Sequence, residues 1–192
     1  MNKESKTTIA NEESMESRLE QILNDALIKA TDTYSVPPQI IWVDNSTIAT
    51  LGNFSASTGK AKAKKTFNVS ALVAASLSNG TVLNYRACLP EGKRRILYVD
   101  TEQSRYHCHN VLARILKLAG LPTDMDNQNL DFIGLREYTP AIRMEVIDYA
   151  LAHNHGYGLV IIDGIRDLLL DINNAGAVSY THLRAHETRH DL

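Results

Sequence analysis

The stretch GKAKAKKT, residues 59–66, combines a leading glycine, four lysines and a final threonine. A tight loop that opens a helix can cradle a polyphosphate with its backbone N–H groups, while a lysine neutralises the phosphates and a hydroxyl holds Mg²⁺. In this stretch Gly59 opens the loop, Lys65 takes the lysine position and Thr66 takes the hydroxyl position. The spacing therefore predicts a site for a polyphosphate and Mg²⁺.

One residue of this stretch departs from the usual pattern, G-x-x-x-x-G-K-[ST], because Lys64 stands at the second glycine. That position tolerates close packing or a positive φ, which an L-residue adopts less readily than glycine. The loop must therefore hold Lys64 at negative φ or bear some strain. Lys60 and Lys62 add positive charge beside the phosphates, and Ala61 and Ala63 keep the turn compact. The alternative is a solvated basic turn, since lysine clusters commonly are only that.

Two carboxylates follow apolar runs further along the chain. GLVIID ends in Asp163, and RILYVD is followed closely by Glu102. Buried parallel strands deliver such side chains to the ligand edge of a sheet. Nucleotide hydrolysis needs one carboxylate near Mg²⁺ and another to orient or deprotonate the attacking water. We expect Asp163 to support the metal and Glu102 to activate water; the alternative for each is a surface turn or a helix cap.

The elements that must position these residues alternate along the chain. The apolar runs IIWV, RILYVD, LDFIGL and GLVIID predict strands, and amphipathic stretches predict helices over residues 66–78, 105–119 and 141–153. NFSAST, residues 53–58, predicts a further strand directly before the lysine-rich loop. Such alternation is typical of crossover connections. We therefore expect an α/β fold with a mainly parallel sheet and helices on both faces.

The two ends of the chain differ from its middle. Residues 1–36 form an acidic, partly helical arm, which Pro37 and Pro38 separate from a core over residues 37–176. Residues 177–192 lack apolar periodicity, and VSYTHLRAHET within them back-translates into a transposase-type sequencing adapter. Sequence derived from processing is excluded from fold reasoning. We interpret this tail as non-native and the core as incomplete at its C-terminus, the alternative being a genuine tail.

Composition excludes several classes of protein. A chain of 192 residues with 44% hydrophobic content can bury the core of one domain. Since 20 basic residues face 22 acidic ones, any DNA binding must come from local patches. Two cysteines are too few for a disulfide framework, and the N-terminus lacks the order of a signal peptide. No apolar run approaches the roughly 20 residues that span a bilayer. We expect a cytoplasmic protein with no membrane role.

Three segments, GNFSASTGKAKAKKTFNVSALVA, ILYVDTEQSRYH and YGLVIIDGIRDLL, together resemble the RecA-like P-loop ATPases, in particular RepA-helicase-like members found on Bacteroides-type mobile elements. The resemblance covers residues from about 37 to 176. It implies a RecA fold, a homo-oligomeric ring or filament, and Mg²⁺-dependent ATP hydrolysis coupled to DNA by a motor or helicase in replication or mobilisation.

The resemblance also implies roles for single residues. Lys65 and Thr66 bind phosphate and Mg²⁺, Glu102 activates water, and Asp163 supports the metal. The family's next strand, with a polar sensor residue, and its later arginine finger are missing. Truncation of the chain explains both absences.

Alternatives of other classes stay open. The chain could bind ATP as a regulatory or DNA-tethering module without productive hydrolysis, or serve as a scaffold whose acidic arm docks a partner. Arg136 and Arg143, which flank the turn after LDFIGL, could contact DNA or a neighbouring subunit, or belong to a solvated helix face. Trp42 could stack on adenine or lie in the core. The HCH at residues 107–109 lacks zinc-site spacing, and we expect these residues to pack against the core or lie on a helix surface.

Overall fold

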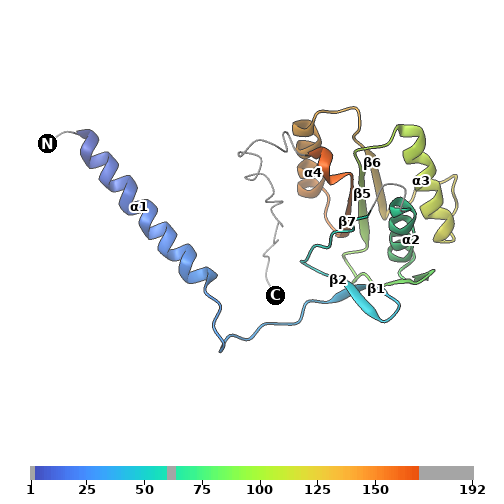
Figure 1. Ribbon diagram of the computed structural model, residues 1–192, viewed down its shortest axis with the longest axis horizontal. Coiled ribbons are helices and arrows are strands. Elements are labelled where there is room, and N and C mark those ends of the chain that lie inside the picture. The colour runs from blue at the N-terminus through green and yellow to red at the C-terminus, as the bar shows by residue number, and fades with distance from the viewer. Residues whose placement is uncertain (1–2, 60–63, 169–192) are drawn as a thin grey trace. The chain divides into compact units, whose positions relative to one another are not determined.

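The computed structural model describes residues 3–59 and 64–168, and the chain divides into two units, Met1–Val36 and Pro37–Leu192 (Figure 1). The first unit contains helix α1, Lys3–Ala26. This helix begins before the apolar stretch that predicted it and ends before Leu27. After it, the backbone N–H of Lys29 and the hydroxyl of Tyr34 both donate to Oδ2 of Asp32, over 2.8 and 2.9 Å. These two donors hold the pKa of Asp32 below its usual range.

The second unit contains an antiparallel sheet of four strands in the order β2-β1-β4-β3. They are β1 Gln39–Val43, β2 Ser46–Thr50, β3 Thr81–Val82 and β4 Tyr85–Ala87. The prediction of a mainly parallel sheet is wrong for this part of the chain. Only two residues, Asp44 and Asn45, join β1 to β2, and Asp44 has φ 50°. A connection this short can join only antiparallel strands, because a parallel pair needs a long crossover.

A smaller parallel sheet of three strands confirms the α/β class. The strands β5 Arg95–Asp100, β6 Leu130–Gly134 and β7 Tyr157–Asp163 lie in the order β6-β5-β7. Three helices, α2 Lys65–Ser78, α3 Arg105–Leu118 and α4 Pro140–His153, flank this sheet, and a short 3₁₀ helix, η1 Ile165–Leu168, follows β7. The three helices differ from the predicted ranges by one residue at one end.

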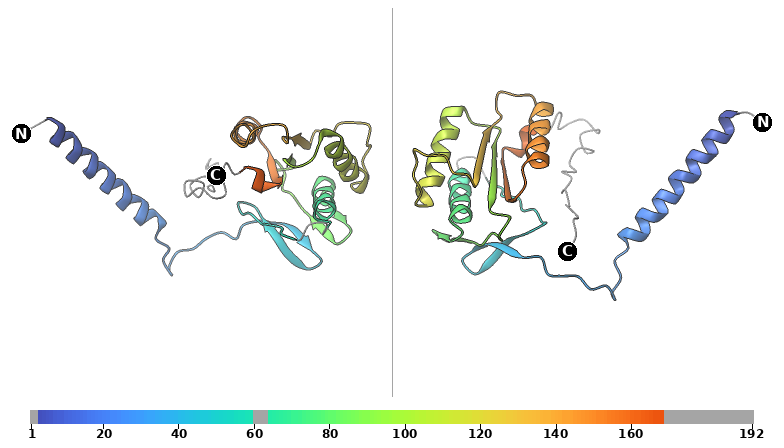
Figure 2. Two further views of the ribbon diagram at one scale, coloured as in Figure 1. Left: turned by 45° about the horizontal axis from the view of Figure 1, so that its top comes forward. Right: turned by 180° about the vertical axis from the view of Figure 1, so that it is seen from behind.

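Helices cover both faces of the parallel sheet, as the alternation predicted (Figure 2). Successive side chains of a strand point to opposite faces. Ile96 and Tyr98 of β5 belong to a core with α2 and α3, and Leu97 and Val99 belong to a second core with α4 and η1. All four are at most 1% exposed, so β5 is the buried centre of the unit. Burying each such apolar side chain contributes about 1.5–3 kcal/mol.

The predicted strand at residues 53–58 is not formed. This segment has no strand pairing; the hydroxyl of Ser55 donates to the carbonyl of Ile48 over 2.7 Å, and Phe54 is 95% exposed. An alternating pattern becomes a strand only where one face is buried and a neighbouring strand pairs with it. Here β1 is the partner of both β2 and β4, and the large side chain of Phe54 meets no core.

Candidate active site

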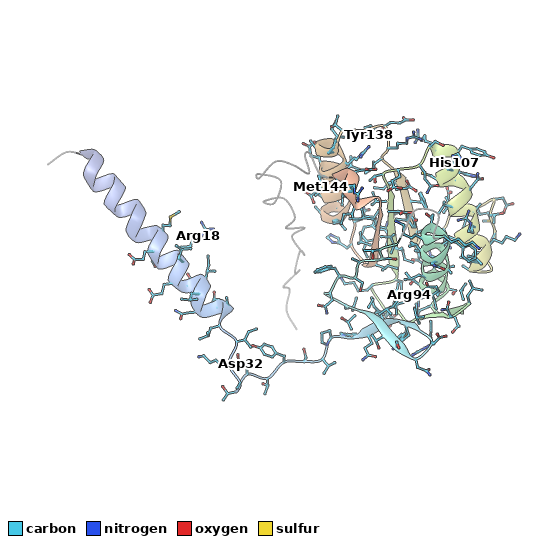
Figure 3. The ribbon with its side chains drawn as sticks, in the orientation of Figure 1. Arg18, Asp32, Arg94, His107, Tyr138 and Met144 are labelled. Atoms are coloured by element: carbon cyan, nitrogen blue, oxygen red, sulfur yellow. The ribbon has the colours of Figure 1, made fainter. Side chains whose placement is uncertain are left out.

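The candidate site lies where the three parallel strands end, at Asp100, Gly134 and Asp163. Figure 3 shows Tyr138 and His107, which lie just beyond β6 and β5, at this end of the sheet, and Arg94, which precedes β5, at the other end. Because parallel strands present their carboxyl ends at one edge, side chains from distant parts of the chain meet there. Ligands of open α/β sheets bind at this edge.

Thr66 and Asp163 are in contact at this edge. The hydroxyl of Thr66, in the first turn of α2, donates to Oδ2 of Asp163 over 3.4 Å. The hydroxyl of Tyr98, a fully buried residue of β5, donates to the same oxygen over 3.0 Å. Tyr98 is held in place by stacking on Phe132, with ring centroids 4.4 Å apart. Burial and the nearby charge of Asp163 raise the pKa of Tyr98, so its hydroxyl stays a neutral donor.

The lysine-rich loop is described at its two ends only, since Lys60, Ala61, Lys62 and Ala63 lie outside the described residues. Gly59 and Lys65 are exposed. Lys64 lies directly before α2 with φ 54° and ψ 29°, a left-handed conformation. Its carbonyl accepts the N–H groups of Phe67 and Asn68 over 3.1 and 3.2 Å, which closes the first turn of the helix. Lys64 therefore has the positive φ for which glycine is suited, at a cost of about 1–2 kcal/mol.

Glu102 lies beside the end of β7. A methyl group built on Gly164, the residue after Asp163, would approach Cγ of Glu102 to 2.7 Å and Cδ to 3.3 Å. Gly164 has φ 96°, a conformation that also disfavours other residues. The exposed side chain of Glu102 thus lies over a glycine that leaves room for it. The structure therefore brings the three residues Thr66, Asp163 and Glu102 to one edge of the sheet.

Asp100 is a site residue to which the sequence analysis assigned no role. It is fully buried, and its Oδ1 accepts the N–H groups of Glu102 and Gln103 over 3.0 and 2.8 Å. Its Oδ2 accepts a hydrogen bond from Nε2 of Gln103 over 2.6 Å. An aspartate that bonds the backbone two residues later is a recognised turn signal, so this role could have been predicted from DTEQ. The turn directs the chain from β5 into Glu102.

The structure corrects the interpretation of Arg143. Its guanidinium donates to three backbone carbonyls: Nε to Leu135 over 2.9 Å, Nη2 to Arg136 over 2.8 Å and Nη1 to Asp167 over 2.7 Å. These bonds engage all three nitrogens with the loop after β6 and with η1. Arg143 is therefore neither a solvated helix residue nor a free contact for DNA, whereas Arg136 is exposed.

Trp42 lies in the antiparallel sheet. The guanidinium of Arg86 sits 3.8 Å from the centre of its ring, and its Nε1 donates to Oε1 of Gln39 over 3.2 Å. A cation over the indole face is a favourable contact, and it covers one of the two faces of the ring. Trp42 is half-buried, so it is not a fully buried core residue.

Oxygen donors at the site suit Mg²⁺, which prefers carboxylate and hydroxyl oxygens and keeps several waters. The hydroxyl of Thr66 and the carboxylate of Asp163 are such donors, 3.4 Å apart. Within residues 3–59 and 64–168, no three His, Cys, Asp or Glu side chains gather as a metal centre. His107 instead has its Nδ1 2.8 Å from the hydroxyl of Ser104. A Mg²⁺ ion held by Thr66 and Asp163 would take its remaining ligands from water and substrate.

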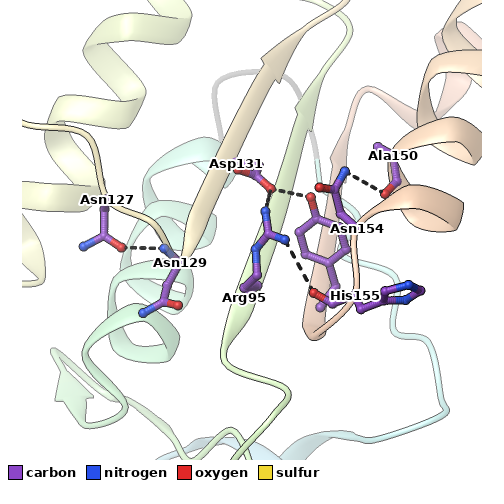
Figure 4. A network of polar contacts seen from close by, with 8 residues as sticks. Arg95, Asn127, Asn129, Asp131, Ala150, Asn154 and His155 are labelled. Carbon is purple, nitrogen blue, oxygen red and sulfur yellow. Dashed lines mark hydrogen bonds and ion pairs between the residues drawn. The ribbon is translucent and has the colours of Figure 1, made fainter.

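The amino ends of the three parallel strands carry a separate polar network (Figure 4). Arg95, at the start of β5, forms an ion pair with Asp131 of β6 over 2.6 Å, and its Nη1 donates to the carbonyl of His155 over 3.5 Å. The hydroxyl of Tyr157, at the start of β7, donates to the same carboxylate. Burial and this bond raise the pKa of Tyr157 to about 12. The network links the N-terminal ends of all three strands, whereas the candidate site lies at their C-terminal ends.

The class that the fold and site define is an α/β protein with a small parallel sheet and a polar site at its carboxyl edge. No protein-family model, curated protein or solved structure matches the chain. In the described part of the chain, no helix has the length and apolar content needed to cross a membrane.

Proposed function

We propose that the chain binds ATP with Mg²⁺ at the carboxyl edge of its parallel sheet and hydrolyses it, as a RecA-like P-loop ATPase does. The observation that carries this proposal is the 3.4 Å contact between the hydroxyl of Thr66 and the carboxylate of Asp163. The sequence patterns assigned these two residues to Mg²⁺ independently of each other. Their meeting across the fold supports a shared ligand.

The start of α2 suits the phosphates. The helix has 14 residues and no acidic residue in its first turn, so nothing local cancels the positive potential of its N-terminus. Lys65 is the first residue of this helix and adds a full charge there. Lys65 and the N–H groups of the first turn hold the β and γ phosphates. Mg²⁺, held by Thr66 and Asp163, supplies further neutralisation of phosphate charge when bound.

Glu102 acts on water. In the hydrolytic step its carboxylate accepts a proton from a water molecule, whose oxygen forms a bond to the γ-phosphorus. The bond between that phosphorus and the oxygen bridging to the β-phosphate breaks, and ADP and phosphate leave. The position of Glu102 over Gly164, the residue after Asp163, supports this role, because both acidic residues then lie at the carboxyl ends of the strands.

Two further features of the proposal come from the family resemblance. The intact protein acts as a homo-oligomeric ring or filament, and it couples hydrolysis to DNA in replication or mobilisation of a genetic element. The second candidate is a regulatory or DNA-tethering module that binds ATP without productive hydrolysis. This candidate uses the lysine-rich loop as a grip for phosphate and needs no residue that activates water.

The experiment measures ATP binding by calorimetry and hydrolysis by phosphate release for the full chain. Lys65→Ala is expected to abolish binding, and Glu102→Gln to keep binding while losing about 10²–10⁴-fold in turnover. Lys93→Ala, an exposed lysine before β5, is the matched control and behaves as wild type. Binding without hydrolysis in the wild type supports the second candidate, and absence of binding refutes both. Normal turnover in Glu102→Gln refutes the assigned role of Glu102.

A further inference from the structure

We infer that Arg143 is a positioning residue, which acts through Asp167 and Thr101 to hold Glu102 in register with Asp163. This inference rests on the proposed function, because it assigns a role in turnover to a residue that touches neither nucleotide nor metal. It gives a role to an arginine whose three nitrogens each donate to a backbone carbonyl.

The anchor of the arrangement is the guanidinium of Arg143 in the first turn of α4. It is half-buried, and its three hydrogen bonds of 2.7–2.9 Å reach carbonyls on two separate segments, the loop after β6 and η1 after β7. The planar guanidinium holds its donors in fixed directions, which the ammonium of lysine cannot reproduce. Arg143 therefore fixes the position of η1, and with it Asp167, relative to the sheet.

The next link joins Asp167 to Thr101. The hydroxyl of Thr101 is 3.3 Å from Oδ2 of Asp167, 2.8 Å from the carbonyl of Gly164 and 3.2 Å from the carbonyl of Asp163. A hydroxyl carries one proton, so these three acceptors compete for it. Thr101 is 1% exposed, and no bulk water is available to replace these partners. Its backbone N–H donates to the carbonyl of Asp163 over 3.1 Å as well.

The last link is Glu102 itself. It follows Thr101 directly in the chain, and its side chain lies over Gly164, the residue after Asp163. The contacts that hold Thr101 against Gly164 therefore also hold Glu102, the proposed base, beside Asp163. The loop after β6 is tied to the same point, because the N–H of Leu135 donates to the carbonyl of Asp100 over 2.7 Å.

The consequence for turnover is large because attack by water requires accurate placement of the base. A displacement of about 1 Å at a reacting group can cost about 10²-fold in rate. Binding of ATP depends on Lys65 and the start of α2, which Arg143 does not contact. Disturbing this arrangement should therefore lower kcat and leave nucleotide affinity nearly unchanged.

The test compares Arg143→Lys, Arg143→Ala and Thr101→Val in the full chain, with kcat, KM and the Kd for ATP measured together with the melting temperature. We expect each folded variant to lose about tenfold to hundredfold in kcat, with Kd within about twofold of wild type. Added guanidinium is expected to restore part of the kcat of Arg143→Ala, and Thr101→Ser to recover most of what Thr101→Val loses. Arg86→Lys, in the antiparallel sheet, is the matched control.

A second variant covers the case in which the Arg143 variants fail to fold. Gly164→Ala places a methyl group against Thr101 and Glu102 directly, and we expect it to lower kcat while ATP still binds. Unchanged kcat in Arg143→Lys and Thr101→Val, beside an active wild type, overturns this inference alone. A loss of affinity for ATP in parallel with the loss of kcat overturns it too, since a positioning role predicts a lower kcat at unchanged affinity. A wild type that does not hydrolyse ATP refutes the proposed function, and this inference with it.

Discussion

Thr66 and Asp163 are 97 positions apart in the chain, yet the hydroxyl of one donates to the carboxylate of the other over 3.4 Å. Two packing relationships bring them together. Helix α2 packs on the face of β5 that carries Ile96 and Tyr98, and β7 pairs with β5 in parallel, so that Asp163 lies opposite Asp100. The start of the helix and the end of β7 therefore meet at the carboxyl edge.

Replacing Thr66 should separate the metal-dependent part of nucleotide binding from the rest. Thr66→Val keeps the shape of the side chain and removes its hydroxyl, so we expect the Kd for ATP with Mg²⁺ to rise about tenfold, equivalent to about 1.4 kcal/mol. With EDTA present the variant and the wild type should bind ATP equally. Calorimetry under both conditions measures this difference. Thr81→Val, a change at an exposed threonine, is the control. If Mg²⁺ raises the affinity for ATP equally in Thr66→Val and in the wild type, the assignment of Thr66 to Mg²⁺ is contradicted.

Because Lys64 has a left-handed backbone conformation, replacing it with glycine is predicted to stabilise the protein. Lys64→Ala removes the charge and keeps the unfavourable φ, whereas Lys64→Gly removes both, so the pair isolates the backbone effect. We expect the glycine variant to exceed the alanine variant by about 1 kcal/mol in the free energy of unfolding. Urea denaturation measures this difference. An alanine variant as stable as the glycine variant would show that Lys64 bears no conformational cost.

The two cysteines should differ in reactivity. Cys108 is 5% exposed, and burial together with the charge of Asp100 raises its pKa to about 11, whereas Cys88 is exposed. Since the thiolate is the reactive form, roughly one Cys108 in a thousand is ionised at pH 8. We expect iodoacetamide to modify Cys88 in the native protein and Cys108 only after unfolding, as read by mass spectrometry of peptides. The Cys88→Ser variant provides the control, because its native form should then resist alkylation altogether.

The polar network at the amino ends of the three parallel strands predicts a stability effect with a defined pH window. Tyr157→Phe removes the hydrogen bond to Asp131, which we expect to lower the free energy of unfolding by about 1 kcal/mol at pH 8 in this partly exposed setting. The pKa of Tyr157 is raised to about 12, so this contribution is complete below the unfolded value of about 10 and is lost as the pH rises toward 12.

Urea denaturation at pH 8 and pH 11 tests this window. The difference in unfolding free energy between wild type and Tyr157→Phe should shrink at the higher pH. Tyr106→Phe, whose ring is 71% exposed, controls for the loss of a tyrosine hydroxyl in general. A difference that stays constant between the two pH values would contradict the role of the bond.

Much of the local structure could be predicted because its causes lie within each segment. The apolar spacing of α2, α3 and α4 defines their extent, and Thr139 and Pro140 mark the start of α4, where the hydroxyl of Thr139 accepts the N–H of Ile142 over 3.5 Å. The ends of β5 and β7 at acidic residues were predicted for the same reason. The antiparallel sheet and the unformed strand at residues 53–58 were not, because pairing depends on which strands are free to pair.

The sequence by itself determined which chemical groups the chain carries and the order in which strands and helices present them. Thr66, Glu102 and Asp163 each follow from a local pattern, because a carboxylate at the end of a buried strand and a hydroxyl at the start of a helix are properties of single segments. Only the tertiary structure decided the partners of Arg143. An arginine's donors can bind water, phosphate or carbonyls, and the choice here depends on loops from separate strands closing around its guanidinium.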